Sequence, residues 1–434
     1  HMARVRHWIQ QQSVAHYPTH ITRQLFSNPW AEFTIAHLFL LTGTDRLANS
    51  VQWFSMVGSL IAVSLIAARL GADKRGEVLA AVVAATIPMG ILQASSTQND
   101  YVTAFWLTCF CYVLLRIKDA SEVTGPPWTW ITCLGLSLGL AILTKGTAYV
   151  FAFPFLCWIT WFLLCRRSWR ALPMLAVVAG LVITLNIGHG LRNWTVFHSI
   201  SGPEEMHQAF VNEVFTDPVL FVSNVVRNLS IELSTSDPDV NYYLRAVVRN
   251  VLRLIGADLN DPRVTYPGLS YYLSTQQTQE DWAGNPLHLL LIFSAGAVLI
   301  VARHRTNQET AGTYALALLA AFALFCICTK WQVWHNRLLL PLLLLGAPFV
   351  AAVFSRVIPG RSRLAVAVVL LVASLPALFA NENRPLVGPR NILTMTREEQ
   401  YYMVRNQWRP AYHQAVDLAL RRNCTEIGVW MDWA

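Results

Sequence analysis

Charged residues are scarce in this sequence. They make up 13% of its 434 residues, whereas hydrophobic residues make up 54%. Soluble domains carry roughly 25% charged and about 45–50% apolar residues. A chain with so little charge cannot cover a large water-exposed surface, so the composition predicts an integral membrane protein.

Long apolar runs, in contrast, are plentiful. A helix needs about 20 apolar residues to cross a hydrocarbon layer about 30 Å thick. We therefore expect an all-α polytopic membrane protein with about ten transmembrane helices, and one more before His1, because the first part of the chain would otherwise be unanchored. The ten runs lie at approximately 51–70, 78–94, 101–117, 129–144, 147–165, 171–189, 286–302, 311–329, 338–354 and 364–380.

Basic residues are almost absent from every second short connection between these runs. One set of connections holds thirteen Lys and Arg residues, and the alternating set holds three, Lys145, Lys330 and Arg337. Because cytoplasmic loops carry the excess of Lys and Arg, we expect both termini, the turn Ser95–Tyr101 and the segment 190–285 to be external. This distribution accounts for the net charge of +8 without a nucleic-acid partner.

The eight cysteines do not predict a disulfide framework. Seven of them lie within or at the ends of apolar runs, and only Cys424 is clearly outside the bilayer. We interpret the seven as small apolar packing residues.

The polar segments divide the chain into three expected parts. Residues 1–50 form an external amphipathic region, the truncated first loop, and residues 51–380 form the transmembrane domain. Residues 381–434 begin a truncated external domain of α/β type. Its expected elements are a helix at about 411–422 and a strand at about 426–431.

Short helices are expected in the external segments. Two amphipathic helices, at about 2–12 and 30–42, would lie flat on the outer membrane surface. In the long external loop, helical periodicity at about 218–233 and 240–256 predicts a small helical lid over the outer face.

One external turn gathers polar residues. It reads SSTQNDY, from Ser95 to Tyr101, and stands between two apolar runs. Capping of the next helix by Asn99 or Asp100 is one interpretation. The other is that Asp100 and Asn99 are catalytic residues, with Asp100 as a carboxylate for proton transfer, metal binding or substrate hydroxyls, because an ionisable group at the membrane boundary is costly and usually functional.

Three further polar residues are expected on the same face. Lys145 lies in the short turn of LTKGT, and His335 and Arg337 lie in WHNRLLLP. Snorkelling of the lysine and interfacial anchoring of the second motif are the structural alternatives. We expect instead that the three cations bind a lipid phosphate, for which the planar guanidinium is suited.

Three carboxylates are weaker candidates. Glu32 lies in NPWAEF, and Glu280 and Asp281 lie in TQEDWAGNPLH. Paired carboxylates can bind a divalent metal or an acceptor and can act as acid and base. Solvated helix entries explain them as well, so a metal cofactor is left open.

The order of these motifs resembles the GT-C superfamily of polytopic glycosyltransferases. It is most similar to the dolichyl-phosphate-mannose protein mannosyltransferases and the bacterial lipid A aminoarabinose transferase. The resemblance covers roughly residues 1–380 and rests on NPWAEF with GTDRLANSVQ, TQNDY, LTKGT and HNRLLLP. It implies that Asp100 matches the family's acidic residue after the third helix, Lys145 the lysine near the carrier phosphate, and Arg337 with Pro341 the element near the same phosphate.

The sequence departs from the family in its first loop. Ser27 and Asn28 stand where the family has a glutamate and a lysine, which puts a role for Glu32 in doubt, and no acidic residue precedes Glu32. Leucine also follows Arg337 where the family often has tyrosine. We expect the family's main catalytic aspartate just upstream of His1, which would leave this fragment inactive by itself.

The resemblance implies a hexosyl or pentosyl transferase. Its expected partners are a polyprenyl-phosphate sugar donor, an acceptor that is a lipid, a glycan or a protein, and membrane lipids. The expected location is the bacterial inner membrane of the cell envelope, with the active site on the periplasmic side. The alternative is a lipid-linked glycan flippase or polytopic transporter. Transporters, however, place their polar site near mid-membrane, whereas the polar residues here gather at one end of the apolar runs.

Overall fold

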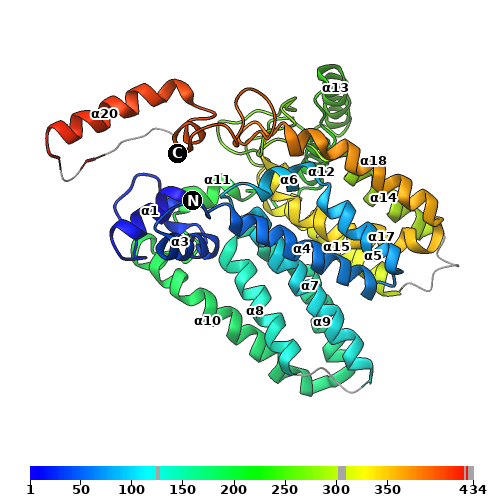
Figure 1. The fold of residues 1–434 in the computed structure, drawn as a ribbon. Coiled ribbons are helices and arrows are strands. Elements are labelled where there is room, and N and C mark those ends of the chain that lie inside the picture. Colours follow the sequence, from blue (N-terminus) through cyan, green and yellow to red (C-terminus); the bar gives the residue numbers. More distant parts are fainter. Residues whose placement is uncertain (124–127, 302–308, 425–426, 429–434) are drawn as a thin grey trace.

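The computed structural model describes residues 1–123, 128–301, 309–424 and 427–428 and is mostly helical (Figure 1). No β-strand occurs within these ranges, where extended pairing is limited to isolated bridges such as Val211 with Thr329. The helical class expected from the sequence is therefore confirmed.

The expected α/β character of the C-terminal part is not supported. Its helix is present as α20 (Arg409–Arg421). The strand expected at 426–431 lies mostly outside the described residues, and the described Ile427 and Gly428 belong to no strand.

All ten apolar runs contain helix. Most of the resulting helices pack around α17, which is the most deeply buried of the long apolar helices. Their bounds are α4 (Ser50–Arg69), α5 (Lys74–Ala85), α6 (Pro88–Ala94), α7 (Asp100–Val123), α8 (Trp128–Thr144), α9 (Thr147–Arg167), α10 (Ala171–Phe197), α14 (Pro286–Val301), α15 (Glu309–Cys328), α17 (Leu340–Val357) and α18 (Gly360–Phe379).

Several of these helices can cross a membrane, but the expected number of ten is not supported. Within the described residues, six helical segments are long and apolar enough, or seven if the bent pair of α5 and α6 is one span. One of the six is the 51-residue run Thr147–Phe197, which includes α9, a short 3₁₀ turn (Ser168–Arg170) and α10. The helices α8 and α14 are shorter, with 17 and 16 residues.

The run expected as one span at 78–94 is two helices. The axes of α5 and α6 differ by 69°. Pro88 is the first residue of α6, and proline has no N–H to continue the hydrogen bonding of a preceding helix. The bend directs α6 toward the turn Ser95–Tyr101.

The two ends of the helical bundle differ in charge. At one end, which we call the basic end, Arg363 donates to both carboxylate oxygens of Asp73 at 2.6 and 2.9 Å, and Arg356 donates to the Leu70 carbonyl at 3.2 Å. The turn Ser95–Tyr101, which leads into α7, and Lys145, between α8 and α9, lie at the opposite end, which we call the polar end.

An N-terminal layer packs beside the polar end. It consists of α1 (Met2–Gln10), α2 (Arg23–Phe26) and α3 (Trp30–Thr42). The bounds of α1 and α3 are close to those expected from the sequence, whereas α2 was not expected. Its own apolar cluster includes Val5, Trp8 and Ile35 and extends to Val102 on α7.

The segment 190–285 is also partly helical. It contains α11 (Glu204–Phe210), α12 (Pro218–Glu232) and α13 (Pro238–Leu254). Asp217 and Asp237 cap α12 and α13 through their side chains, and a proline follows each cap. The short α16 (His335–Leu338) packs against α12, and α19 (Arg397–Tyr401) precedes a second 3₁₀ turn (Asn406–Trp408) before α20.

Candidate active site

An ion pair joins two turns at the polar end. Asp100 is the first residue of α7, and Lys145 lies between α8 and α9; its ammonium donates to Oδ1 of the aspartate. The Asp100 side chain is 2% exposed and that of Lys145 is 19% exposed. Burial lowers the pKa of Lys145, Asp100 opposes this effect, and the positive charge of Arg337 adds to the lowering.

Asp100 does not serve as a helix cap. The first-turn N–H groups of Tyr101 and Val102 instead donate to Oε1 of Gln52 on α4, at 2.8 and 3.1 Å. Oδ2 of Asp100 has no hydrogen-bond partner among the described residues. The carboxylate therefore keeps one oxygen, Oδ2, without a partner beside Lys145. A carboxylate that acts on a ligand needs such an oxygen.

Asn99 holds this arrangement in place. Its amide donates to the carbonyl of Thr144, the last residue of α8, at 3.0 Å. The bond ties the turn that carries Asp100 to the turn that carries Lys145. Asn99 therefore positions the pair through its neighbours.

A second group of charges borders the same turn. Arg337 on α16 donates to Oδ1 of Asp281 at 2.6 Å and also to the Gln98 side chain. Arg384 forms an ion pair with Glu280 and donates to the Ser95 hydroxyl at 3.0 Å. The structure thus brings together five of the candidates: Asp100, Lys145, Glu280, Asp281 and Arg337.

The arrangement of Glu280 and Asp281 does not favour a metal site. Both carboxylates are paired with arginines. Across the described ranges, no group of three or more His, Cys, Asp or Glu side chains is arranged to hold a metal ion. The two residues instead fix Arg337 and Arg384 next to the Ser95–Tyr101 turn.

His335 belongs to a different group from Arg337. Its Nδ1 lies 2.7 Å from the side-chain oxygen of Asn228 on α12, and its ring packs against Phe325 with a centroid distance of 4.8 Å. Burial, followed by the charge of Arg227, lowers the pKa of His335 to about 3. The imidazole is therefore neutral near pH 7 and does not contribute a positive charge toward a phosphate.

Glu32 also lies in its own group, inside the N-terminal layer. Its carboxylate is 2% exposed and pairs with Arg4 at 3.3 Å and with His1 at 2.8 Å. Arg4 also donates to the carbonyl oxygens of Leu25 and Ser27, at 2.5 and 2.7 Å. Glu32 is thus part of a buried network that holds the loop before α3.

Sequence reasoning missed several residues of the polar end. Gln52 lies inside the apolar run 51–70, where a single polar residue attracts little notice. Arg384 lies in NENRP, after the last apolar run, and so was outside the short connections whose basic residues were counted. A single glutamine near the start of a span and a lone arginine just after the last span were the available signals. The carboxyl group of Glu232 at the end of α12 was likewise not singled out.

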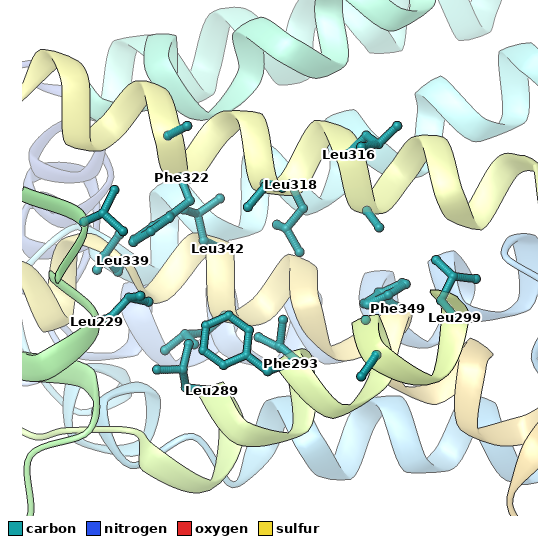
Figure 2. A pocket seen from close by; sticks show the side chains of 18 of the residues that line it. Leu229, Leu289, Phe293, Leu299, Leu316, Leu318, Phe322, Leu339, Leu342 and Phe349 are labelled. Atoms are coloured by element: carbon teal, nitrogen blue, oxygen red, sulfur yellow. The ribbon is translucent and has the colours of Figure 1, made fainter. Parts of the chain in front are cut away.

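A large apolar groove leads toward this site. Its volume is about 1350 Å³, and α12, α14, α15 and α17 form its walls (Figure 2). Leu316 and Phe293 on its walls are 67% and 49% exposed, so the groove is open to the surroundings of the bundle. Leu339, two residues after Arg337, lines the groove. An elongated apolar molecule in the groove would therefore have its end close to the cationic group.

One of three comparisons with known proteins found a match. The model of the dolichyl-phosphate-mannose-protein mannosyltransferase family matches residues 27–189, the part that contains Asp100 and Lys145. No curated protein and no solved structure matched the chain. The family implies membrane glycosyltransferase activity in general, with a lipid-linked sugar donor. The resemblance inferred from the motifs is confirmed for residues 27–189, which match the model of the dolichyl-phosphate-mannose-protein mannosyltransferase family.

Proposed function

We propose that the protein transfers a sugar from a polyprenyl-phosphate carrier to an acceptor at the polar end of the bundle. The observation that carries the proposal is the position of the apolar groove, whose lining includes Leu339, two residues after Arg337. A polyprenyl chain fits the groove chemically, because the chain and the groove walls are both apolar and can pack against each other. Its phosphate would then reach the cations.

The proposed reaction exchanges one bond at the anomeric carbon. The bond from this carbon to the phosphate oxygen breaks, a bond to the acceptor oxygen forms, and polyprenyl phosphate leaves. Negative charge develops on the leaving phosphate, where Lys145 and Arg337 can stabilise it in a site shielded from water. Both cations are held in place by carboxylates, so little reorganisation is required.

The acceptor must also lose a proton. Asp100 has a free carboxylate oxygen beside Lys145, so it can accept this proton or orient the acceptor hydroxyl. Asn99 positions the aspartate through its bond to α8. In this proposal the acceptor, which can be a lipid, a glycan or a protein, approaches from the periplasmic side of the bacterial inner membrane.

A donor comparison with the full-length protein tests the function. Purified protein in liposomes is supplied with a polyprenyl-phosphate-linked sugar or with the corresponding nucleotide sugar, and released polyprenyl phosphate and product are measured. The proposal predicts turnover of the lipid-linked donor alone. Turnover of the nucleotide sugar, or donor movement across the bilayer without cleavage, would overturn it.

A further inference from the structure

Two carboxyl groups line the apolar groove, and they lie at opposite ends of it. Glu309 begins α15 at the basic end and is exposed, whereas Glu232 ends α12 near α16. Glu232 is only 2% exposed. A buried carboxyl group in a wall made of Leu, Ile and Phe is costly unless it has a partner.

The partners of Glu232 are incomplete. Its Oε2 accepts a hydrogen bond from the Asn285 side chain at 2.7 Å, and its backbone carbonyl accepts one from the Asn285 N–H at 2.8 Å. Oε1 is buried and has no hydrogen-bond partner among the described residues. Because buried polar atoms in folded proteins are nearly always hydrogen-bonded, this oxygen indicates a polar atom of a ligand.

The charged groups on the surrounding elements are engaged elsewhere. Arg337 on α16 pairs with Asp281. Three further titratable groups have partners of their own. Arg227 on α12 donates to Asn224, Thr265 and nearby carbonyl groups, His335 on α16 bonds Asn228, and His288 on α14 bonds Thr86.

The ionisation of Glu232 follows from its surroundings. Burial raises the pKa of Glu232 to about 8, and the hydrogen bond from Asn285 opposes this shift. At neutral pH the group is therefore mostly a carboxylic acid with an O–H to donate. Above its pKa it becomes a carboxylate, which repels a phosphate.

We propose that Glu232 is a positioning residue that hydrogen-bonds, through Oε1, an oxygen of the phosphate-bearing head of the lipid in the groove. The identity of this lipid as polyprenyl phosphate rests on the proposed function. The group acts beside the reacting atoms, holding the head between the end of α12 and Arg337. Glu232 thereby favours lipids that carry a hydrogen-bond acceptor at the α12 end of the groove over purely apolar lipids.

Binding of polyprenyl phosphate at two pH values tests the proposal. For the wild-type protein, loss of the acidic proton between pH 7 and pH 9 should weaken binding by about tenfold, since only the neutral form donates. Glu232→Gln keeps a donor that does not titrate, so its affinity at pH 9 should exceed that of the wild type by a similar factor. Ionisation of the phosphate itself affects both proteins equally.

Glu309→Gln is the matched control, because it removes a carboxyl group from the other end of the same groove. It should show the pH dependence of the wild type. If Glu232→Gln and the wild type weaken in parallel, the proposal for Glu232 is overturned while carrier binding stands. If the wild type does not bind polyprenyl phosphate at either pH, the proposed function is overturned as well.

Chemical labelling provides a second readout in the unmutated protein. Dicyclohexylcarbodiimide adds to a protonated carboxyl group in an apolar site: the acid proton moves to a carbodiimide nitrogen, the carboxyl oxygen bonds the central carbon, and no group leaves. At pH 7 we expect peptide mass spectrometry to find the adduct on Glu232 rather than Glu309, and less of it with polyprenyl phosphate present. An unlabelled Glu232, or labelling that the lipid leaves unchanged, would contradict the proposal.

Discussion

Lys145 and Asp100 form an ion pair although 45 positions separate them in the sequence. The pair exists because α7, α8 and α9 pack together and Asn99 ties the start of α7 to the end of α8. A buried cation with one carboxylate partner remains able to bind a second anion. The pair therefore links the fold directly to the proposed binding of a carrier phosphate.

Removal of the Lys145 charge should weaken carrier binding. A hydrogen bond to a charged group contributes about 1.5–3 kcal/mol, so Lys145→Met should raise the Kd for polyprenyl phosphate by roughly ten- to hundredfold. Titration of the purified protein with the lipid measures this change. Lys74→Met, which removes an exposed lysine at the basic end, is the control and should leave the Kd unchanged. Equal affinities for both variants would contradict the role of Lys145.

Obstruction of the groove should affect long carriers selectively. Gly296 on α14 lines the groove, and a Cβ atom at this position would meet no atom within 4 Å. Gly296→Phe therefore fills groove space without a clash in the wall. Exclusion of one five-carbon unit removes the packing contacts of that unit with the groove walls, so binding of long polyprenyl phosphates should weaken by roughly tenfold.

Carrier length and a second glycine provide the controls for this experiment. A short-chain analogue with two isoprene units should bind the Gly296→Phe protein and the wild type within about twofold, since its tail buries few CH₂ groups. Gly188 on α10 also has open space around its Cβ position, but it does not line the groove. A Gly188→Phe protein that loses long-chain binding to the same extent would show that the groove is not the tail site.

The buried pair of Arg4 and Glu32 should stabilise the N-terminal layer. Arg4→Met leaves the carboxylate with His1 alone, and breaking a buried ion pair by removing one partner costs about 3–5 kcal/mol. Hydrogen exchange of the amides in α3 should become faster. The double variant Arg4→Met with Glu32→Leu leaves no unpaired charge, so it should lose less protection than Arg4→Met; an equal loss would contradict this explanation.

The same layer should loosen in acid. Burial raises the pKa of Glu32, but His1 and Arg4 lower it by more, so the folded-state pKa lies below the ordinary value of 4.5. The stabilisation is therefore present above about pH 4.5 and is lost as the pH falls through the lower folded-state value. Protection factors in α3 should decrease over that range, and Glu32→Gln should remove the decrease. If the Glu32→Gln protein shows the same decrease of protection factors in acid, the decrease arises from another titratable group.

The sequence predicted the helical elements well, because apolar runs and amphipathic spacing are local signals. The helix from Trp30 to Thr42 has the expected bounds, and the helices now called α12 and α13 lie within two residues of expectation. The number of spans was less predictable. Pro88 divides one apolar run into helices 69° apart, and whether such a run crosses the membrane depends on tertiary packing.

The candidate site was predictable only in part. The distribution of basic residues among the turns placed Asp100, Lys145 and Arg337 at the same end of the bundle. The ion pairs of Lys145 with Asp100 and of Arg337 with Asp281 depend on helix packing and could not be predicted. His335 was grouped with Arg337 because they are two residues apart. In the helical turn of α16, residues i and i+2 face different directions, so His335 turns to Asn228. Glu232 gave no signal, since a carboxylate at a helix end usually faces water.

The most direct test of the account is sugar transfer by the full-length Asp100→Asn protein in liposomes. Asp119→Asn is the matched control, because it changes the same side chain at the other end of α7, where Asp119 pairs with Arg69 in an exposed position. Loss of a carboxylate that accepts the acceptor proton or orients the acceptor hydroxyl is expected to slow transfer by about 10²–10⁴-fold. The account predicts this loss in Asp100→Asn with carrier affinity within about threefold of the wild type, and full activity in Asp119→Asn. Full transfer activity in Asp100→Asn would contradict it.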